Sequence, residues 1–359
     1  MPAMKYVLGL ISLILVLPSS NNLATAQDTI WQLQESNSKA SLRGLCVVSD
    51  QIVWASGSGG TVLRTTDGGK NWKNVSAAGA EKLDFRDIHA FNDRRAVIIN
   101  AGQPARFYLT TDGGETWKQT FRHKHKKSFF DAVSFWDDQH GIAMSDPVDD
   151  RVLLVETTNG GKSWKELPAE RRPEKKRGEA GFAASGTNMR VVGKDTVIIG
   201  LGGAEEEQQE KTSRVVISSD RAKTWKSYEV PMPRNMSSGI FSIAFAGEKL
   251  GIAVGGNYVE QEITPGNMAL TTDGGKTWKR TSGKPTSGYR SGVAFGKNRI
   301  GKRVVVAVGP TGTDVSIDDG KTFGNVSKEG FHAVQFTPDR KHGWASGADG
   351  RIAKWLGQQ

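Results

Sequence analysis

The sequence has one cysteine, Cys46, in 359 residues, and a single thiol cannot form an internal disulfide. The apolar neighbours of this residue, Leu45 and Val47, favour a buried thiol. The six histidines show none of the spacings that are typical of metal sites. His123 and His125 lie close together, but the lysines and the arginine around them oppose the binding of a cation. We therefore expect no bound metal.

The chain also lacks the glycine motifs of dinucleotide and phosphate-binding loops, which stand between a strand and a helix. Its nearest glycine cluster, at 57–60, lies between two expected strands and is typical of a turn. We therefore expect no cofactor.

Long apolar runs are scarce. The run Tyr6–Leu17 follows Lys5 and is too short for a comfortable membrane span. It precedes Ala24-Thr25-Ala26, which resembles a signal-peptidase site, so residues 1–26 are predicted to be a signal peptide and 27–359 a single mature domain. No cysteine follows the predicted cleavage site to carry a lipid anchor. We expect an exported protein, either periplasmic or secreted.

The chain does contain an internal repeat: a hydroxyl residue, any residue, Asp, two glycines, any residue, Thr or Ser, and Trp. It occurs, intact or nearly so, at Thr65–Trp72, Thr110–Trp117, Thr157–Trp164, Ser218–Trp225, Thr271–Trp278 and Ser316–Phe323. The acidic positions are 45 to 61 residues apart, which suits one four-stranded propeller blade per copy. Each copy follows a short expected strand, turns through Asp-Gly-Gly, and opens the next strand with its Trp.

This phrase is the Asp box, and it resembles the repeats of sialidase-like and other BNR-type propellers. A motif present six times cannot be one active site, so we expect its residues to be structural. They are Asp67, Trp72, Asp112, Trp117, Asn159, Trp164, Asp220, Trp225, Asp273, Trp278, Asp318 and Phe323. Box four has Arg221 and Ala222 in place of both glycines, which predicts a looser turn. Box six has Asp319 for the first glycine.

Two further strands are expected before each box, and they yield seven inner strands for six boxes. The inner strand of the fourth unit is harder to align, and we place it within Gly181–Ser185. The seventh unit ends at Gln359 without a fourth strand, whereas Thr29–Gln34 near the N-terminus matches a box-to-strand segment. We therefore predict an all-β, seven-bladed propeller whose last blade is completed by the N-terminal strand, because this leaves no long open sheet edge. A six-bladed ring is the alternative.

The box turns should lie on one face of the ring, and the longer, more variable loops on the other. Loops on a rigid scaffold often carry binding residues. Arg43, Arg86, Arg290 and His332 begin the inner strands of four units at equivalent positions, and Asp87 and Asp131 occupy the next position in two units. We expect the variable face to bind through Arg43, Arg86, Asp131, Asp146, Asn257, Tyr258, Tyr289, Arg290 and His332. Arginines around one opening suit carboxylates or other anions, although they could instead pair with aspartates around the rim.

The net charge of +10 is concentrated in two basic runs, at 122–127 and 171–177. These runs are either solvated loops or a docking patch for acidic protein, anionic lipid or polyanionic glycan. The predicted export signal argues against a nucleic-acid partner.

Over its mature length the chain resembles the photosystem II stability/assembly-factor-like propellers. The resemblance rests on Phe85-Arg86-Asp87-Ile88, the Thr-Thr-Asp-Gly-Gly boxes, and the closing segment Gly343–Gly350. It implies an exported, non-enzymatic scaffold that docks a protein or membrane complex through an arginine-rich face, with Arg43, Arg86 and Arg290 as docking candidates. We expect this scaffold to be a monomer. An anionic glycan is a further possible partner.

The alternative class is a glycoside hydrolase of the sialidase type, because Asp boxes also occur there. A sialidase needs an arginine cluster, a tyrosine nucleophile with a carboxylate partner, and a separate acid. The candidates would be Asp87, Asp131, Asp146, Tyr258 and Tyr289. Two carboxyl groups about 5–10 Å apart in one pocket would favour this alternative.

Overall fold

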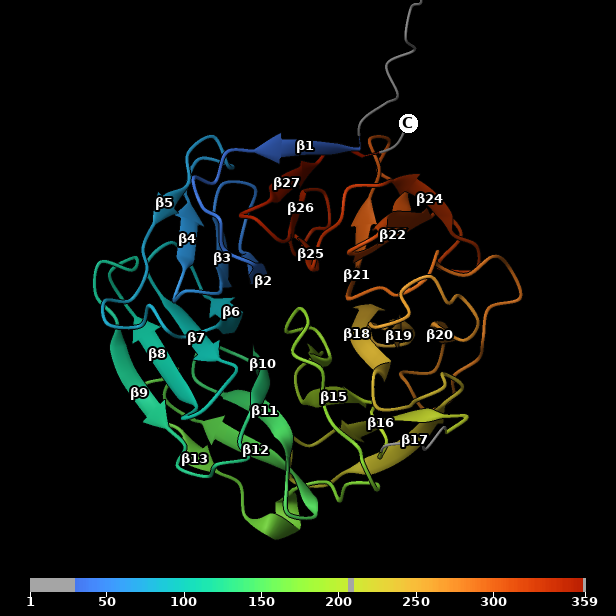
Figure 1. The fold of residues 1–359 in the computed structure, drawn as a ribbon, viewed down its shortest axis with the longest axis horizontal. Helices are drawn as coiled ribbons and strands as arrows, with labels where there is room; N and C mark the ends of the chain where they lie inside the picture. Colours follow the sequence, from blue (N-terminus) through green and yellow to red (C-terminus); the bar gives the residue numbers. More distant parts are fainter. Residues whose placement is uncertain (1–29, 206–209, 358–359) are drawn as a thin grey trace, which may run out of the picture.

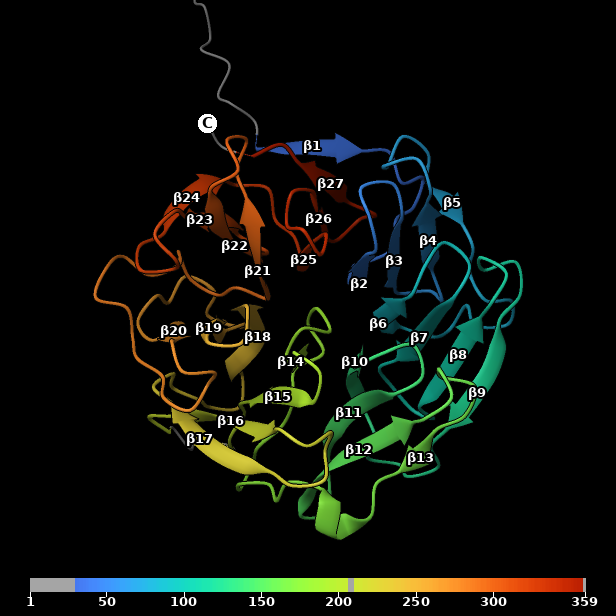
Figure 2. The ribbon, with the colours of Figure 1, turned by 180° about the vertical axis from the view of Figure 1, so that it is seen from behind.

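Seven antiparallel sheets surround a common axis in the computed structural model, which describes residues 30–205 and 210–357 (Figure 1). The same ring is visible from behind in Figure 2. The prediction of seven blades is confirmed, and the six-bladed alternative is wrong. Within the described residues, the one stretch of helix is a 3₁₀ turn, η1 (Ala169–Arg171). Among the described residues, no helix is long and apolar enough to cross a membrane.

Blades 1 to 4 each contain four strands in sequence order from the axis outward. Blade 1 holds β2 (Leu42–Val47), β3 (Val53–Gly57), β4 (Val62–Thr65) and β5 (Lys73–Asn74). Blade 2 holds β6 (Phe85–Ala90), β7 (Ala96–Asn100), β8 (Arg106–Thr110) and β9 (Lys118–Arg122). Blade 3 holds β10 (Phe130–Phe135), β11 (Gly141–Val148), β12 (Arg151–Thr157) and β13 (Lys165–Glu166). Blade 4 holds β14 (Met189–Val192), β15 (Thr196–Leu201), β16 (Ser213–Ser218) and β17 (Lys226–Val230).

Blade 5 differs because it has three described strands, β18 (Ser238–Ala246), β19 (Leu250–Asn257) and β20 (Met268–Thr271). Blade 6 holds β21 (Gly292–Lys297), β22 (Arg303–Gly309), β23 (Gly312–Ser316) and β24 (Gly324–Ser327). Blade 7 holds β25 (Ala333–Phe336), β26 (Gly343–Ser346), β27 (Ile352–Trp355) and, as its outer strand, β1 (Trp31–Gln34).

The two ends of the chain close the ring. Strand β1 pairs antiparallel with β27, from Trp31 opposite Trp355 to Gln34 opposite Ile352 (Figure 1). This confirms the predicted N-terminal strand within the described residues, whereas the predicted signal peptide, 1–26, lies outside them. Because the last blade combines strands from both ends of the chain, opening the ring requires breaking this sheet.

Each Asp box is a compact hydrogen-bonded turn. In box two, the hydroxyl of Thr110 donates to Asp112 Oδ1 at 2.8 Å and accepts a bond from the Gly114 amide at 2.8 Å. The hydroxyl and amide of Thr116 donate to the same carboxylate, and these bonds, together with the one from Thr110, hold the pKa of Asp112 below its ordinary value. The equivalent hydroxyl-to-Asp or hydroxyl-to-Asn bond is present in all six boxes.

Box four keeps this geometry without its glycines. Arg221 and Ala222 adopt left-handed φ values of 57° and 61°, and the Ala222 amide still donates to Ser218 Oγ at 2.8 Å. The prediction of a looser turn is therefore wrong. The bonds to Ser218 and Asp220 fix the loop and offset a backbone strain of about 1–2 kcal/mol per non-glycine residue.

The apolar seam between each pair of neighbouring blades contains an aromatic side chain that comes from an Asp box or, in one seam, from β1. Trp117 of blade 2, for example, reaches back to blade 1, where its indole donates to Val75 O at 2.7 Å and packs edge-on against Trp54. The seventh seam, between blades 6 and 7, has no box and uses Trp31 of β1 instead. The full set is Trp72, Trp117, Trp164, Trp225, Trp278, Phe323 and Trp31. The box aromatics therefore pack between blades, and the variants below test the structural role predicted for them.

Replacing the Trp117 side chain should weaken the seam between blades 1 and 2. We expect Trp117→Ala to lower the free energy of unfolding by about 3 kcal/mol, through lost packing and an unpaired Val75 carbonyl. Trp117→Phe keeps a ring and loses the hydrogen bond, and should cost about 1 kcal/mol. Urea unfolding followed by circular dichroism would measure both, and an unchanged midpoint for Trp117→Ala would contradict the structural role.

The effects of backbone conformation and of space at a box glycine can be separated by comparison with Gly79, which lies outside the boxes. Gly114 and Gly79 have similar φ values, 85° and 77°, but a Cβ on Gly114 would lie 2.6 Å from Val75 Cβ, whereas a Cβ on Gly79 would meet no atom of the described residues within 4 Å. Gly79→Ala should lower the free energy of unfolding by about 1 kcal/mol, because alanine disfavours the left-handed conformation. Gly114→Ala should lower it by about 2 kcal/mol more, because the added methyl group also forces the seam apart. Equal losses in urea unfolding would show that seam packing plays no part.

Candidate functional site

A concave pocket of about 390 Å³ lies where the inner strands begin, on the axis of the ring. We call it the mouth pocket. Its lining comes from the inner-strand ends of six blades and from three loops, and consists of Arg43, Arg86, Phe129, Asp131, Gly181, Phe182, Ala183, Ala184, Phe241, Tyr258, Gln261, Tyr289, Pro310 and His332. Six of the nine predicted binding residues are therefore in one place.

Irregular pairing of the inner strands aims several of these side chains. The pairing of the first strand with the second shifts register between Leu42 and Gly44, between Phe85 and Asp87, between Phe130 and Ala132, and between Ile240 and Ser242. The residues skipped by these shifts are Arg43, Arg86, Asp131 and Phe241, and all four line the mouth pocket. A bulge leaves one residue unpaired and turns its side chain away from the regular alternation. Asp131 is thus equivalent to Arg86, one position away from the predicted alignment with Asp87.

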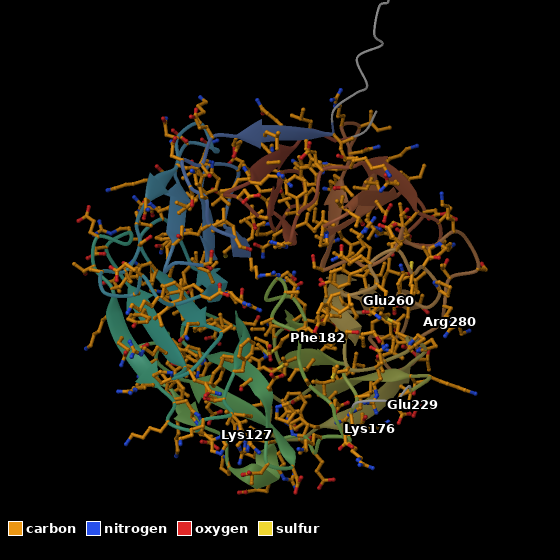
Figure 3. All side chains as sticks on the ribbon, viewed as in Figure 1. Lys127, Lys176, Phe182, Glu229, Glu260 and Arg280 are labelled. Atoms are coloured by element: carbon orange, nitrogen blue, oxygen red, sulfur yellow. The ribbon has the colours of Figure 1, made fainter. Side chains whose placement is uncertain are left out.

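The floor of the pocket is the segment 181–187, which we call the crossing segment. Its carbonyls accept bonds from blade 1, Arg43 Nη1 to Ala184 O at 3.3 Å, and from blade 2, Arg86 Nη1 to Ala183 O at 3.4 Å. Further bonds join it to blades 3, 5 and 6: Gly181 N to Asp146 Oδ1, Thr187 Oγ1 with Ser242 Oγ, and Ser185 Oγ to Ser291 O. It therefore spans the axis of the ring, and Phe182 is drawn near the centre (Figure 3).

The crossing segment corrects the sequence prediction for blade 4. We placed the inner strand within Gly181–Ser185, but that strand is β14, which begins at Met189. Phe182, which looked like the aromatic start of a strand, instead stacks on Phe241 of blade 5 with ring centroids 3.9 Å apart. The one sign in the sequence that this segment is not a regular strand was its two glycines, at 181 and 186. The structure explains them, because Cβ atoms there would lie less than 2.5 Å from carboxylate oxygens of Asp131 and Asp87.

The pocket carries positive charge. Arg86 pairs with Asp84 at 2.7 Å, whereas Arg43 has no ion-pair partner in the described part of the chain and contacts one carbonyl. Burial, together with the neighbouring Arg86 charge, lowers the pKa of Arg43 from its ordinary value. Burial and the charges of Arg43 and Arg86 also lower the pKa of His332 to about 3, so this imidazole is neutral at pH 7 and lies 3.1 Å from Ser41 Oγ. Arg43 is thus a half-buried cation with no paired anion in the described chain, and a carboxylate is the group that would pair with it best.

Arg290 does not belong to the pocket, and the prediction that placed it at the opening is wrong. It is fully buried and donates to Asp314 Oδ2 at 2.8 Å, and Asp314 is fully buried too. A second nitrogen donates to Tyr289 O at 2.8 Å. Strand β21 begins at Gly292, and its pairing with β22 has no register shift. For this arginine the alternative stated above holds, namely that it pairs with an aspartate instead of binding an anion.

The acidic candidates occupy different places. Asp131 is fully buried in the pocket wall, and neither carboxylate oxygen has a hydrogen-bond donor among the described residues. Asp146 lies near it and accepts the Gly181 amide at 2.9 Å. Asp87 lies outside the pocket lining, where it accepts the Val133 and Ile88 amides at 2.7 and 2.8 Å, and burial raises its pKa to about 8.

An aromatic wall faces the charged side. The ring of Tyr289 packs edge-on against that of Phe241, with ring centroids 4.8 Å apart, and the centroids of the Tyr258 and Phe241 rings are 6.1 Å apart. Burial raises the pKa of Tyr289 well above its ordinary value, which opposes its ionisation. Asn257 does not line the pocket; its amide donates to Glu260 Oε2 at 2.8 Å and shapes the loop that carries Tyr258.

The two basic runs differ in their surroundings. The run 171–177 is largely neutralised by pairs of Arg171 with Glu156, Arg172 with Glu166, Lys175 with Asp150, Lys176 with Glu229 and Arg177 with Glu205. In the run 122–127, His123 contacts Glu166 and the lysines are exposed. Lys127 and Lys176 lie near the rim of the ring, away from the mouth pocket (Figure 3). Among the described residues, no three His, Cys, Asp or Glu side chains converge as a metal site.

Comparisons with known proteins agree with this fold. A family model described as Sortilin, neurotensin receptor 3 (Sortilin-Vps10) matches residues 60–176, which contain the first three boxes. The structure titled "YCF48 bound to D1 peptide" is 16% identical, with a TM-score of 0.61 over 92% of this chain and 96% of that one. YCF48 from Cyanidioschyzon merolae is 19% identical, with a TM-score of 0.63 over 91% and 99%. No curated protein sequence matches. The expected resemblance to the photosystem II assembly-factor-like propellers is confirmed for the fold.

The buried acids predict a pH dependence of stability. Burial and the neighbouring Asp146 raise the pKa of Asp131 well above its ordinary value, and burial raises that of Asp146 to about 6. The folded protein therefore holds these protons more tightly than the unfolded chain. Their stabilising contribution is full below about pH 4 and is lost as the pH rises through 6 and beyond.

Asp131→Asn removes this ionisation, so the variant should unfold at higher urea concentration than wild type at pH 8 and at the same concentration at pH 4. Asp150→Asn is the control, because this side chain is 99% exposed and its ion pair with Lys175, at 4.0 Å, contributes little to stability; the variant should match wild type at both pH values. An Asp131→Asn midpoint below that of wild type at pH 8 would show that the carboxylate is stabilising when charged.

Proposed function

We propose that this protein is a non-enzymatic scaffold that binds an acidic segment of a partner protein in the mouth pocket. The observation that carries the proposal is Arg43, a half-buried guanidinium without an ion-pair partner among the described residues, in a concave site beside Arg86. Charged groups in such sites are usually paired, and a carboxylate fits the planar fork of an arginine. The facing aromatic wall offers apolar contact to the rest of the segment.

The comparisons support a peptide as the ligand. One structure of similar fold is that of YCF48 bound to D1 peptide, so a propeller of this shape can hold a peptide. We extend this to a protein partner, alone or within a membrane complex. Of the three arginines predicted to form the docking face, Arg43 and Arg86 line the mouth pocket, whereas Arg290 is buried in a pair with Asp314.

The predicted signal peptide is the basis for proposing that the protein acts outside the cytoplasm, in the periplasm or after secretion. This part of the proposal depends on residues 1–26 and is independent of the pocket.

A hydrolase is less well supported. Among the described residues, Asp131 is the one carboxyl group in the pocket lining, whereas glycoside hydrolysis by two carboxyls needs both to face the same space. The raised pKa of Tyr289 opposes its use as a nucleophile, and the third arginine of a sialidase-like cluster is buried. Binding of an anionic glycan uses the same arginines and is an outcome that the experiment below would reveal.

Selection from a random-peptide display library would test the proposal. Wild-type protein should enrich peptides with acidic residues, and Arg43→Glu should lose this enrichment, because it replaces an attraction by a repulsion. We expect the affinity of the selected peptides to fall by about 100-fold or more in this variant.

Arg94→Glu is the matched control, because Arg94 is an exposed arginine outside the pocket lining. It should select the same acidic peptides as wild type. If wild type enriches no acidic peptide, the proposal fails, and binding of polyanionic oligosaccharides by the same protein would then identify a glycan site.

A further inference from the structure

Exposed apolar side chains gather beside the mouth pocket. Eight large apolar residues are exposed in the described parts of the chain, and four of them lie in two loops of blade 5 and its approach. They are Met236, Tyr258, Val259 and Ile263, which are 63%, 45%, 68% and 44% exposed. We call this set the apolar ridge. Single exposed apolar residues are common on protein surfaces, but a cluster of four marks an interaction surface.

The ridge is a built surface, because hydrogen bonds join its two loops. The Tyr258 amide donates to Ser237 O at 3.1 Å, and Ser238 pairs with Asn257 at the ends of β18 and β19. The Asn257 side chain accepts the Val259 amide at 2.9 Å and donates to Glu260 at 2.8 Å. Met236 is therefore held beside the segment 257–263, and its exposure does not come from a free chain end.

The ridge is continuous with the mouth pocket through Tyr258, which belongs to both. On its other side is a second cavity of about 520 Å³, lined in part by Ile263, Glu260 and Arg280. Phe182 lies near the ring axis, while Glu260 and Arg280 lie progressively farther out across blade 5 (Figure 3). A ligand that starts at Arg43 and runs outward over blade 5 would cross the ridge.

Charge decides which kind of partner suits this path. The pocket end is cationic through Arg43 and Arg86, and the ridge carries two exposed carboxylates, Glu260 and Glu262, without ion pairs in the described chain. Those carboxylates would be repelled by an anionic lipid surface, so an apolar loop inserted into such a membrane is disfavoured. An extended protein segment can satisfy both ends, with an acidic residue in the pocket and apolar side chains on the ridge.

We propose that the apolar ridge is the second half of the binding site and selects partner segments in which an acidic residue lies close in sequence to a cluster of apolar side chains. This inference rests on the proposed function for its acidic anchor and adds the apolar requirement and the path of the segment across blade 5. Truncated ligands that fill the mouth pocket alone would bind weakly, because most of the apolar contact lies on blade 5.

The same peptide display library tests the ridge when it is selected in parallel on a ridge variant. Wild type should enrich peptides that combine an acidic residue with a nearby apolar cluster. The double variant Met236→Asn and Val259→Asn removes the apolar contact without adding charge, and it should keep the acidic residue and lose the apolar cluster. Peptides selected on wild type should bind this variant about tenfold or more weakly. Both substituted residues are exposed, so the fold should be unaffected.

Ile317→Asn is the matched control, because Ile317 is 74% exposed in box six and lines neither cavity. It should select the same peptides as wild type. If the ridge variant selects acidic peptides with the same apolar cluster as wild type, or if wild type selects acidic peptides without one, the ridge inference is overturned and the proposed function stands. If wild type selects no acidic peptide, both fail.

Discussion

The rest of the structure depends on the packing of one blade against the next. In six of the seven seams, the aromatic side chains include the Trp or Phe that ends an Asp box. The box turn fixes that ring by clamping the hairpin before it, as the Thr110–Asp112 bonds do for Trp117. In the seventh seam Trp31 takes the same place, so the β1–β27 pairing both closes the last sheet and completes the last seam.

A closed ring gives the binding site its rigidity and its position. The inner strands begin around one axis, so residues from distant parts of the chain converge there without a dedicated loop. Irregular pairing at the start of four of these strands then turns Arg43, Arg86, Asp131 and Phe241 into the mouth pocket. The crossing segment closes the floor and lends carbonyls to both arginines, which holds two like charges near each other.

The pocket is electrostatically incomplete by itself. Arg43 has no acid and Asp131 has no donor among the described residues, although Arg86 is close enough to Asp131 to act on its pKa. Uncompensated buried groups cost stability, and they are common where a ligand completes the pairing. The apolar ridge adds an uncharged surface next to this site, so the candidate interface combines a specific polar anchor with a larger hydrophobic contact.

The sequence alone was sufficient for the fold, because the Asp box is a local motif: its hydroxyl, carboxylate and glycines act within one turn, and its spacing counts the blades. The same locality revealed the N-terminal strand, since Thr29–Gln34 matches the strand that follows a box. Local patterns could not distinguish Arg43 from Arg290, which begin similar segments, because the difference is a register shift in one strand and a buried Asp314 on another. They also misplaced the start of blade 4, because Phe182 stacks on Phe241, 59 positions along the chain, and does not begin an inner strand. Which side chains face the axis depends on long-range pairing, and only the tertiary structure decides that.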